Sequence, residues 1–377
     1  MTTRLPVIVG FGGINPAGRS SGHHGYRRLV YDQLASGKQQ STLKALAALM
    51  QCDADEQSIL ANTLVRKIND NLFDPDHYRA NKQAMMTGLQ NAPLSFTLKK
   101  NQLPEQLPAS WTVTELDNLQ VQITATEPLS VLFPDGRASK VNSAGQLPTG
   151  FDPEALYQSR SHPRGLQLTV FGASDAVQSL GIPWQTVQDK VPGDQIAVYA
   201  SSAMGQLDFN GSGGMLQSAL LGKRVSAKNC PLGLAEMTAD FVNAYILGSV
   251  GATGANVGAC ATFLYNLRQG ITDIRAGNCR VAVIGSSEAP ITPEVIEGYR
   301  TMGALAEDDA LLKLDGRSEG RPDHTRACRP FAENCGFTLA EASQFVILFD
   351  DELALELGAN IYGSVADVFV NADGFKK

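Results

Sequence analysis

Cys260 is the residue of this sequence with the clearest capacity for chemistry, and it lies in the run Gly-Ala-Cys-Ala-Thr over 258–262. The small-residue stretch 248–257 before it predicts a turn and then a short buried strand. After it, apolar residues recur at helical spacing at Leu264, Leu267, Ile271 and Ile274. The sequence therefore predicts a strand-to-helix elbow, with the sulfur on the first turn of the helix.

At the start of a helix, unpaired backbone N–H groups and the positive end of the helix dipole favour a thiolate. A thiolate is the nucleophilic form of cysteine, and small neighbours allow an acyl chain to approach it closely. The competing interpretation is an inert core thiol, the commoner role of a lone cysteine in an apolar segment. The elbow favours a nucleophile at Cys260, and we assign no role to Cys230, Cys279, Cys328 and Cys335.

The composition is that of a globular protein with a large core. The chain has 377 residues, of which 43% are hydrophobic and 18% charged, enough for one large α/β domain or two smaller ones. A formal net charge of -7 argues against binding to nucleic acid or to an anionic membrane surface. No apolar run reaches membrane-spanning length. The sequence has no Cys-x-x-Cys pair, so it gives no indication of a zinc site or a redox motif. Free thiols and an N-terminus without a signal-peptide pattern favour a cytoplasmic protein.

The elements that must position Cys260 form an alternating series. The sequence predicts strands at 5–9, 195–200, 280–285, 343–349 and 361–370, and helices at 166–180, 239–247, 260–276 and 293–302. Alternation of this kind indicates an α/β fold, with a buried mixed or parallel sheet layered by helices. Residues 30–150 differ, because polar helical stretches lead into proline-spaced alternating segments, and we interpret them as a surface-lying elaboration.

Several landmarks, taken in order, resemble the β-ketoacyl-[acyl carrier protein] synthases, the condensing enzymes of fatty-acid synthesis. They are the first strand with its loop to Gly18, the elbow at 258–262, the strand that ends in Ser-Ser-Glu at 286–288, the loop 302–306 and the stretch 329–341. The fuller match, including 30–150 and the segment 370–377, resembles the FabY branch of that family. In this branch the synthase domain carries an N-terminal insertion.

The resemblance implies a thiolase-like, layered αβαβα fold made of two similar halves. Residues 1–29 and 151–377 are expected to form the N-terminal half, and 30–150 an inserted elaboration with no assigned activity. The family uses two histidines beside the cysteine, and none of the five histidines here lies in such a motif. We therefore expect the first half to be essentially complete and the second missing or only begun at 361–370. The chain alone is then not expected to catalyse condensation.

The function implied by the resemblance is decarboxylative Claisen condensation of an acyl thioester with malonyl carrier, an acyltransferase reaction in which Cys260 is the catalytic nucleophile. The implied partners are acyl carrier protein in its acyl and malonyl forms, acyl-CoA as an alternative donor, and a second copy of the chain in a homodimer. No cofactor and no metal are expected, because the thioester supplies the activation. Phe337 is expected near the acyl site and Glu341 as a buried structural carboxylate beside it. Thr253 and Asn256 are expected to line the acyl pocket or the subunit contact, with plain packing as the alternative.

Two other functions stay open on the sequence. One is a thiolase-like acyltransferase, which uses the same fold and nucleophile without decarboxylation. The other is a non-catalytic partner subunit resembling a chain-length factor, and the presence of Cys260 argues against it. A basic cluster at Lys223, Arg224 and Lys228 is either a solvated face or a docking surface for an acidic carrier protein.

Overall fold

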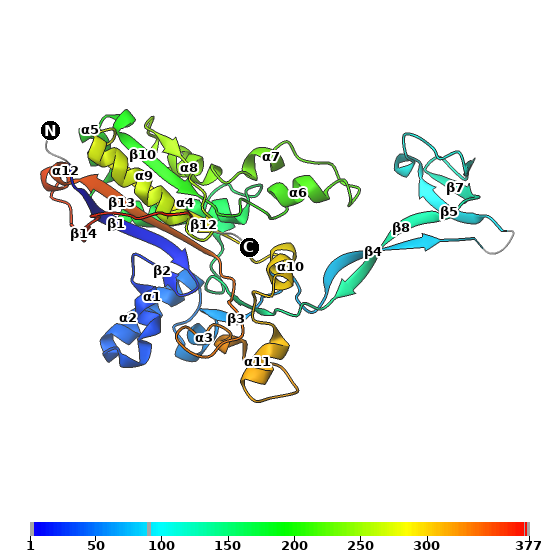
Figure 1. Cartoon of the computed structure of the whole chain (residues 1–377), viewed down its shortest axis with the longest axis horizontal. Helices are drawn as coiled ribbons and strands as arrows, with labels where there is room; N and C mark the ends of the chain where they lie inside the picture. Colours follow the sequence, from blue (N-terminus) through cyan, green and yellow to red (C-terminus); the bar gives the residue numbers. More distant parts are fainter. Residues whose placement is uncertain (1–3, 89–91, 373, 375–377) are drawn as a thin grey trace. The chain divides into compact units, whose positions relative to one another are not determined.

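The computed structural model describes residues 4–88, 92–372 and 374, which form two compact units (Figure 1). Unit 1 comprises the described residues of 1–73 and 140–377, and unit 2 comprises those of 74–139. The separate unit is smaller than the region 30–150, because 30–73 and 140–150 belong to unit 1. That 30–150 is an insertion stays a prediction. Part of the segment 370–377, which contributes to the resemblance, lies outside the described residues.

Unit 1 is built on a mixed sheet. Its strands are β1 (Pro6–Asn15), β2 (Gly18–Arg19), β10 (Ile196–Ser201), β11 (Thr253–Gly254), β12 (Val281–Glu288), β13 (Ala342–Asp350) and β14 (Gly363–Ser364). They pair in the order β11-β10-β12-β13-β1-β14, with β2 beside β1. Strand β10 runs parallel to both β11 and β12, whereas β13 is antiparallel to β12 and to β1. The carboxyl ends of β10, β11 and β12 therefore meet at one edge of the sheet.

Alternate residues of the central strands enter two separate cores, one on each face of the sheet. Val198, Val283 and Ile347 pack with α4 (Arg164–Ser179), α5 (Trp184–Lys190) and α8 (Met237–Val242). Tyr199, Ile284 and Leu348 pack with α9 (Thr262–Ala276). Because helices cover both faces, the strands are apolar at successive positions, as the sequence shows.

Most predicted elements of unit 1 are confirmed. The strands at 5–9, 195–200, 280–285 and 343–349 correspond to β1, β10, β12 and β13. The four predicted helices correspond to α4, to α8 with the π-helical turn η5 (Asn243–Leu247), to α9 and to α10 (Pro293–Thr301). Thr292 caps α10, since its side chain accepts the N–H of Val295.

The strand predicted over 361–370 is wrong, because only β14 pairs there, with Val7 and Ile8 of β1. Val365 and Val368 both pack against the core on the α9 face. Their spacing of three residues does not fit the two-residue period of a strand, so the chain leaves the sheet edge after β14.

The remaining helices of unit 1 surround this sheet at its margins. They are α1 (His24–Leu29), α2 (Ser36–Met50), α3 (Glu56–Ala61), α6 (Ser212–Gln217), α7 (Asn229–Leu232), α11 (Asp308–Leu314) and α12 (Asp351–Glu356). A further two-stranded sheet joins β3 (Val65–Lys67) to β9 (Ser143–Gly145). None of the described helices is long and apolar enough to span a lipid bilayer.

A buried carboxylate on α4 anchors the turn between β1 and β2. Asp175 accepts the N–H of Gly13 at 2.9 Å and forms an ion pair with Arg19 at 2.6 Å. The ring of His24, which begins α1, is also buried there, and its Nδ1 accepts the N–H of Arg19 at 3.1 Å. These contacts connect the first strand to the helix that covers it.

The regular structure of the described residues of unit 2 consists of β-strands and the 3-10 turn η2 (Lys100–Gln102). An antiparallel ribbon pairs β4 (Tyr78–Met86) with β8 (Leu129–Arg137), and a three-stranded sheet has the order β5 (Leu94–Lys99), β7 (Gln120–Ala125), β6 (Trp111–Glu115). Val121, Ile123 and Ala125 are buried on the central strand. The rings of Phe96 and Trp111 meet edge to face with centroids 5.4 Å apart.

Candidate active site

Cys260 lies between β11 and α9, on the segment that leaves the carboxyl end of the parallel strands. Ala259 has a φ of 48°, in the left-handed region, which turns the chain sharply just before the cysteine. Helix α9 begins at Thr262, so the prediction of a thiol on the first helical turn is wrong by two residues. The left-handed residue delays the start of the helix. The thiol side chain is exposed.

Thr262 closes the elbow from its helical side. Its hydroxyl donates to the carbonyl of Ala259 at 2.6 Å and accepts the N–H of Gly258 at 3.1 Å. Gly258 has no room for a side chain, because a Cβ there would lie 2.4 Å from the ring of Tyr265. The small residues around Cys260 therefore allow a tight turn packed directly on α9.

Asn266, one turn further along α9, fastens the elbow to the sheet. It is fully buried, and its side-chain oxygen accepts the N–H of Asn256 at 2.9 Å. Its amide donates to the hydroxyl of Ser201, at the end of β10, at 2.8 Å. Ser201 in turn donates to the carbonyl of Asn256 at 2.7 Å. Every polar group of this buried network has a partner, which favours a single arrangement.

Sequence reasoning missed Asn266, Thr262 and Ser201. A usable signal was present, because Asn266 occupies the same helical face as Gly270 and Ile274, which are buried. A polar side chain at a buried helical position requires hydrogen-bond partners. Their identity, however, depends on β10, which lies far away in the sequence.

The predicted acyl-site residues Thr253 and Asn256 share the segment that leads to Cys260. Thr253 lies on β11 opposite Val198 and is exposed, so the strand predicted as buried is a short edge strand instead. Asn256 is half-buried and is held through its backbone by Asn266. Their contact with an acyl chain stays a prediction.

Phe337 lies on a different part of unit 1, before β13. Its ring is half-exposed and packs edge to face on Tyr299 of α10, with centroids 5.6 Å apart. Its N–H donates to the carbonyl of Ala304 at 3.0 Å, which holds the loop that follows α10. None of the contacts described for Phe337 reaches Cys260.

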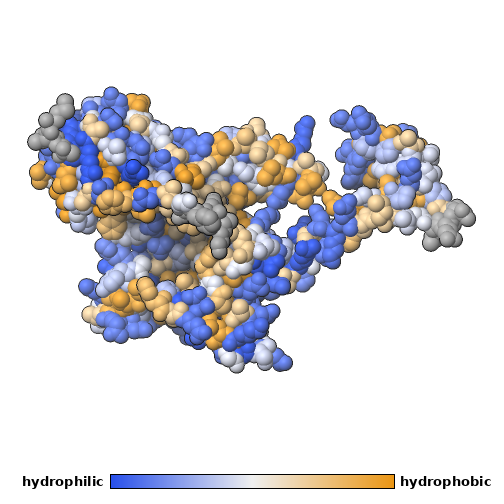
Figure 2. Space-filling view, in the orientation of Figure 1, coloured by the Kyte–Doolittle hydropathy of each residue, from blue (hydrophilic) through white to orange (hydrophobic). Residues whose placement is uncertain are grey.

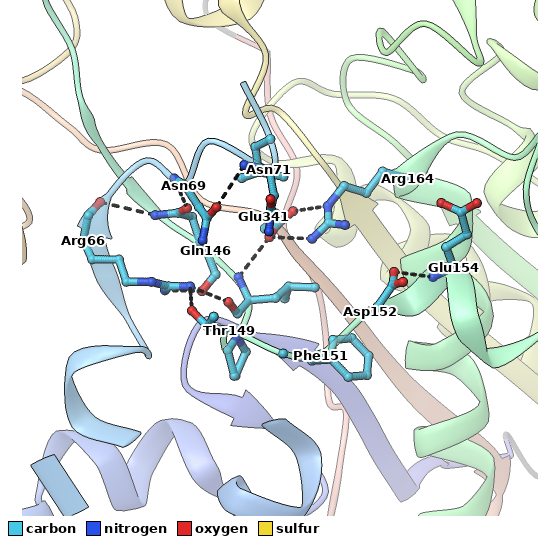
Figure 3. Close-up of a pocket in the computed structure, with 14 residues that line it drawn as sticks. Arg66, Asn69, Asn71, Gln146, Thr149, Phe151, Asp152, Glu154, Arg164 and Glu341 are labelled. Atoms are coloured by element: carbon cyan, nitrogen blue, oxygen red, sulfur yellow. Dashed lines mark hydrogen bonds and ion pairs between the residues drawn. The ribbon is translucent and has the colours of Figure 1, made fainter. Parts of the chain in front are cut away.

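Glu341 is a buried carboxylate with a basic and a backbone partner, as one sequence interpretation proposed. It accepts from Arg164 at 2.6 and 3.0 Å and from the N–H of Leu147 at 2.9 Å. Although burial opposes the charge on Arg164, the hydrogen bonds and charge of Glu341 raise the pKa of that guanidinium. The pair stands at the wall of a 370 Å³ cavity, together with Arg66, Gln146 and Thr149 (Figure 3).

Arg66 lies across this cavity from Arg164 and binds backbone rather than an acid (Figure 3). Its guanidinium donates to the carbonyls of Leu64, Gln146 and Leu147 and to the hydroxyl of Thr149. Burial lowers its pKa. The hydrogen bonds described for the cavity wall thus join residues of the protein to one another. This supports a structural role for Glu341.

Glu288 is an additional acidic group at the carboxyl end of β12. It accepts from the hydroxyl of Ser202 at 2.9 Å and from the N–H of Ala203. Burial raises the pKa of this carboxyl, and the two hydrogen bonds oppose that shift. Among the described residues, no group of three or more His, Cys, Asp and Glu side chains is placed to hold a metal ion.

A helix-covered mixed sheet with a cysteine elbow at the carboxyl ends of its parallel strands is an arrangement of the thiolase-like fold. The sequence model described as "Beta-ketoacyl synthase, N-terminal domain" matches residues 136–354, more than half of the chain. The chain belongs to this family.

One relative is the β-ketoacyl-[acyl-carrier-protein] synthase FabY of Pseudomonas aeruginosa, with 51% identity over 100% of this chain and 62% of that protein. This chain superimposes on the crystal structure of that FabY with a TM-score of 0.95, and the match covers 100% of this chain and again 62% of the FabY chain. A 3-oxoacyl-[acyl-carrier-protein] synthase 2 of Staphylococcus aureus is 27% identical over 58% of this chain and 49% of its own length. A type II polyketide ketosynthase solved with its acyl-carrier protein shares the fold, with a TM-score of 0.52, 17% identity and coverage of 97% of this chain and 62% of its own. The chain thus spans about three fifths of the FabY relative.

Proposed function

We propose that the protein is a β-ketoacyl-[acyl carrier protein] synthase of fatty-acid biosynthesis, which condenses an acyl thioester with a malonyl thioester. The observation that carries this proposal is the exposed thiol of Cys260 on an elbow held by Thr262 and Asn266. The likeness to FabY over the whole chain supports the same reaction. Because the chain spans 62% of that relative, the complete activity is proposed for the protein as a whole.

The first step assigned to this chain is acyl transfer. The Cys260 thiolate attacks the carbonyl carbon of an acyl thioester, and a tetrahedral oxyanion forms. Backbone N–H groups of the elbow, including that of Cys260, are proposed to stabilise this oxyanion. The carbon–sulfur bond of the donor then breaks, the donor leaves as a thiol after it takes up a proton, and the acyl group remains on Cys260.

The second step joins the two carbon chains. Malonyl thioester loses its carboxylate as carbon dioxide, and the electron pair of that carbon–carbon bond becomes a carbanion. The carbanion attacks the acyl carbonyl on Cys260, and the carbon–sulfur bond to the cysteine breaks, which regenerates the thiolate. In the family two histidines assist this step, so we assign the acyl transfer, and not the decarboxylation, to the residues described here.

Acyl carrier protein is the proposed donor, with acyl-CoA as an alternative source of the acyl group. The proposed docking surface is the segment of α6 and α7, where Figure 2 shows apolar surface. Leu216, Leu220 and Leu221 are exposed there. The cation of Lys223 lies 4.9 Å from the ring centre of Phe209, and Lys228 donates to Ser161 at 2.8 Å. A basic and apolar surface suits an acidic carrier, since charge steers the encounter and apolar contacts retain it.

A homodimer is proposed from the open edge of the sheet. Strand β11 is paired on one side, with β10, and lies at the end of the strand order. Exposed apolar side chains flank it at Val250, Val257 and Leu264. A second copy of the chain would cover both the strand edge and these side chains.

We also propose a cytoplasmic location, because all six cysteines are free thiols.

Intact mass spectrometry after incubation with acetyl- and longer acyl-thioesters tests the nucleophile. We expect one acyl adduct, mapped to Cys260, and its loss in Cys260→Ala. The matched control is Cys328→Ala, which removes another exposed thiol outside the proposed docking surface and should load normally. A label on Cys230, Cys328 or Cys335 instead would refute the proposal. Loading without release of carbon dioxide from malonyl carrier by the whole protein would favour the thiolase-like alternative.

A further inference from the structure

Four consecutive residues at the end of β10, Ser201–Met204, contact three parts of the active-site region. Ser201 binds the elbow, Ser202 and Ala203 bind the end of β12, and Met204 meets α10. We infer that Glu288 is a positioning residue for the condensing reaction, which holds this segment and through it the elbow of Cys260. The inference rests on the proposed function of Cys260.

Glu288 is the last residue of β12, and β12 runs beside β10 in parallel register as far as the pair Ser201 and Ser286. Beyond that pair the two strands have no further ladder bonds, and the Glu288 side chain replaces them. Its two oxygens accept separately, one from the hydroxyl of Ser202 and the other from the N–H of Ala203. The carboxylate therefore fixes both the side chain and the backbone of the segment.

The path from this segment to the nucleophile is short. Ser201 directly precedes Ser202, and its hydroxyl donates to the carbonyl of Asn256 at 2.7 Å and accepts from Asn266 at 2.8 Å. A backbone shift at Ser202 and Ala203 would move Ser201 and disturb both bonds. Asn256 lies four residues before Cys260, on the same loop, so the elbow would lose an anchor.

The same segment reaches the loop of Phe337. The hydroxyl of Tyr299 lies 3.7 Å from the sulfur of Met204, and the ring of Tyr299 packs on Phe337. The family resemblance implies that Phe337 lies near the acyl site. Glu288 is thus connected to two predicted components of the acyl site, the elbow and the Phe337 loop, through one segment of four residues.

Two substitutions of Glu288 are expected to give different results. Alanine leaves the N–H of Ala203 without its acceptor, and an unsatisfied partly buried donor is costly. Glutamine can accept that N–H with its carbonyl oxygen and donate its amide to Ser202. Ser202 can then donate to the carbonyl of Gly205, which lies 3.3 Å away. Near-normal loading in Glu288→Gln would show that the hydrogen bonds of this side chain, and not its negative charge, position the segment.

The experiment compares Glu288→Ala, Glu288→Gln and the wild type in the rate of acyl loading on Cys260, in the alkylation rate of that thiol and in amide hydrogen exchange. We expect Glu288→Ala to slow loading about tenfold and to speed exchange at 201–204 and 256–260, and Glu288→Gln to stay within about threefold of wild type. The matched control is Glu352→Ala, which removes an exposed carboxylate on α12, outside the proposed docking surface.

Loading and exchange in Glu288→Ala equal to wild type would overturn the inference, and so would equal losses in Glu288→Gln and Glu288→Ala. If wild type itself does not load Cys260, the proposed function fails, and hydrogen exchange alone then decides the positioning role. If Glu288→Ala does not fold, Ser202→Ala tests the same contact, because it removes one donor to the carboxylate. We expect loading about threefold slower in Ser202→Ala, and unchanged loading would overturn the inference.

Discussion

The hydroxyl of Thr262 donates to the carbonyl of Ala259 across 2.6 Å, and Ala259 is the left-handed residue that turns the chain into Cys260. The left-handed conformation strains the backbone of a non-glycine residue, so the surrounding contacts must stabilise it. Thr262 and the packing of Gly258 on Tyr265 are the described contacts that do so. The elbow is therefore a constrained turn, and its constraints can be removed one at a time.

Thr262→Val keeps the shape of the side chain and removes its hydroxyl. The N–H of Gly258 then loses its acceptor, and the carbonyl of Ala259 keeps only the backbone N–H of Thr262, which lies 3.1 Å away. The loss should lower the free energy of unfolding by ~1–2 kcal/mol and slow acyl loading several-fold. Thr262→Ser, which keeps the hydroxyl, is the control and should load at nearly the wild-type rate. Urea unfolding and intact mass measure the two effects. Equal behaviour of the valine and serine variants would contradict this role.

Gly258→Ala should distort the elbow, because the added Cβ would lie 2.4 Å from the ring of Tyr265. We expect a loss of ~2 kcal/mol of stability, typical of an overpacked site, and a marked loss of acyl loading. Tyr265→Ala in the same chain should restore part of both losses, since it removes the clashing ring. A double-mutant cycle measures the coupling between the two positions. Additive losses would show that the clash is not the cause.

Asn266→Ala removes the side chain that joins α9, β10 and the elbow loop. The N–H of Asn256 and the hydroxyl of Ser201 lose partners in a buried site, so we expect a loss of ~2–3 kcal/mol. Thr272→Ala on the exposed face of α9 is the matched control and should change stability by less than ~0.5 kcal/mol. Chemical denaturation followed by circular dichroism compares them. Similar losses in both would argue against a special role for the network.

His24 should make the stability of unit 1 depend on pH. Burial, and then the positive charges of Arg27 and Arg19, lower the pKa of His24 from 6.5 to about 4, against the opposing charge of Asp175. The unfolded chain therefore binds a proton at His24 near pH 6.5, whereas the native state binds this proton only near pH 4. Stability should fall as the pH drops through this window, by up to about 3 kcal/mol.

Glutamine at this position can accept the N–H of Arg19 without titrating, so His24→Gln should flatten that part of the pH dependence. Unfolding free energies of both proteins between pH 4 and 8, roughly the range over which histidine titrates, give the difference. Parallel curves for the two proteins would exclude His24 as the source.

Thr253→Pro tests the proposed dimer edge. Proline cannot donate a backbone hydrogen bond, and Thr253 lies on the edge strand β11 with its side chain exposed. If a second copy pairs along this strand, the variant should shift toward monomer in sedimentation velocity at micromolar concentration. Thr272→Ala serves again as a control away from the edge. A wild-type protein that sediments as a monomer would refute the dimer itself.

The order of strands and helices in unit 1 could be predicted because each element carries its own periodicity. The apolar runs at β10, β12 and β13 and the helical repeat of α9 depend on burial of a local face, which neighbouring residues encode. Cys260 was found in the same way, since small residues followed by a helical repeat indicate an elbow. The exact start of α9 was missed, because the left-handed conformation of Ala259, held by Thr262, does not follow from the helical repeat.

The partners of the polar groups could not be predicted, because they join residues distant in sequence. Asn266 meets Ser201, Glu288 meets Ser202, and Glu341 meets Arg164 across separations of 65, 86 and 177 residues. A periodic pattern reports which face of an element is buried, but not which side chain of another element lies opposite. The packing of α9 on β10 brings the first pair together, the register of β10 against β12 brings the second, and the packing of α4 beside β13 brings the third. The chemistry of the cysteine could therefore be predicted from the sequence alone, whereas the hydrogen-bond network that holds the cysteine in place depends on the tertiary structure.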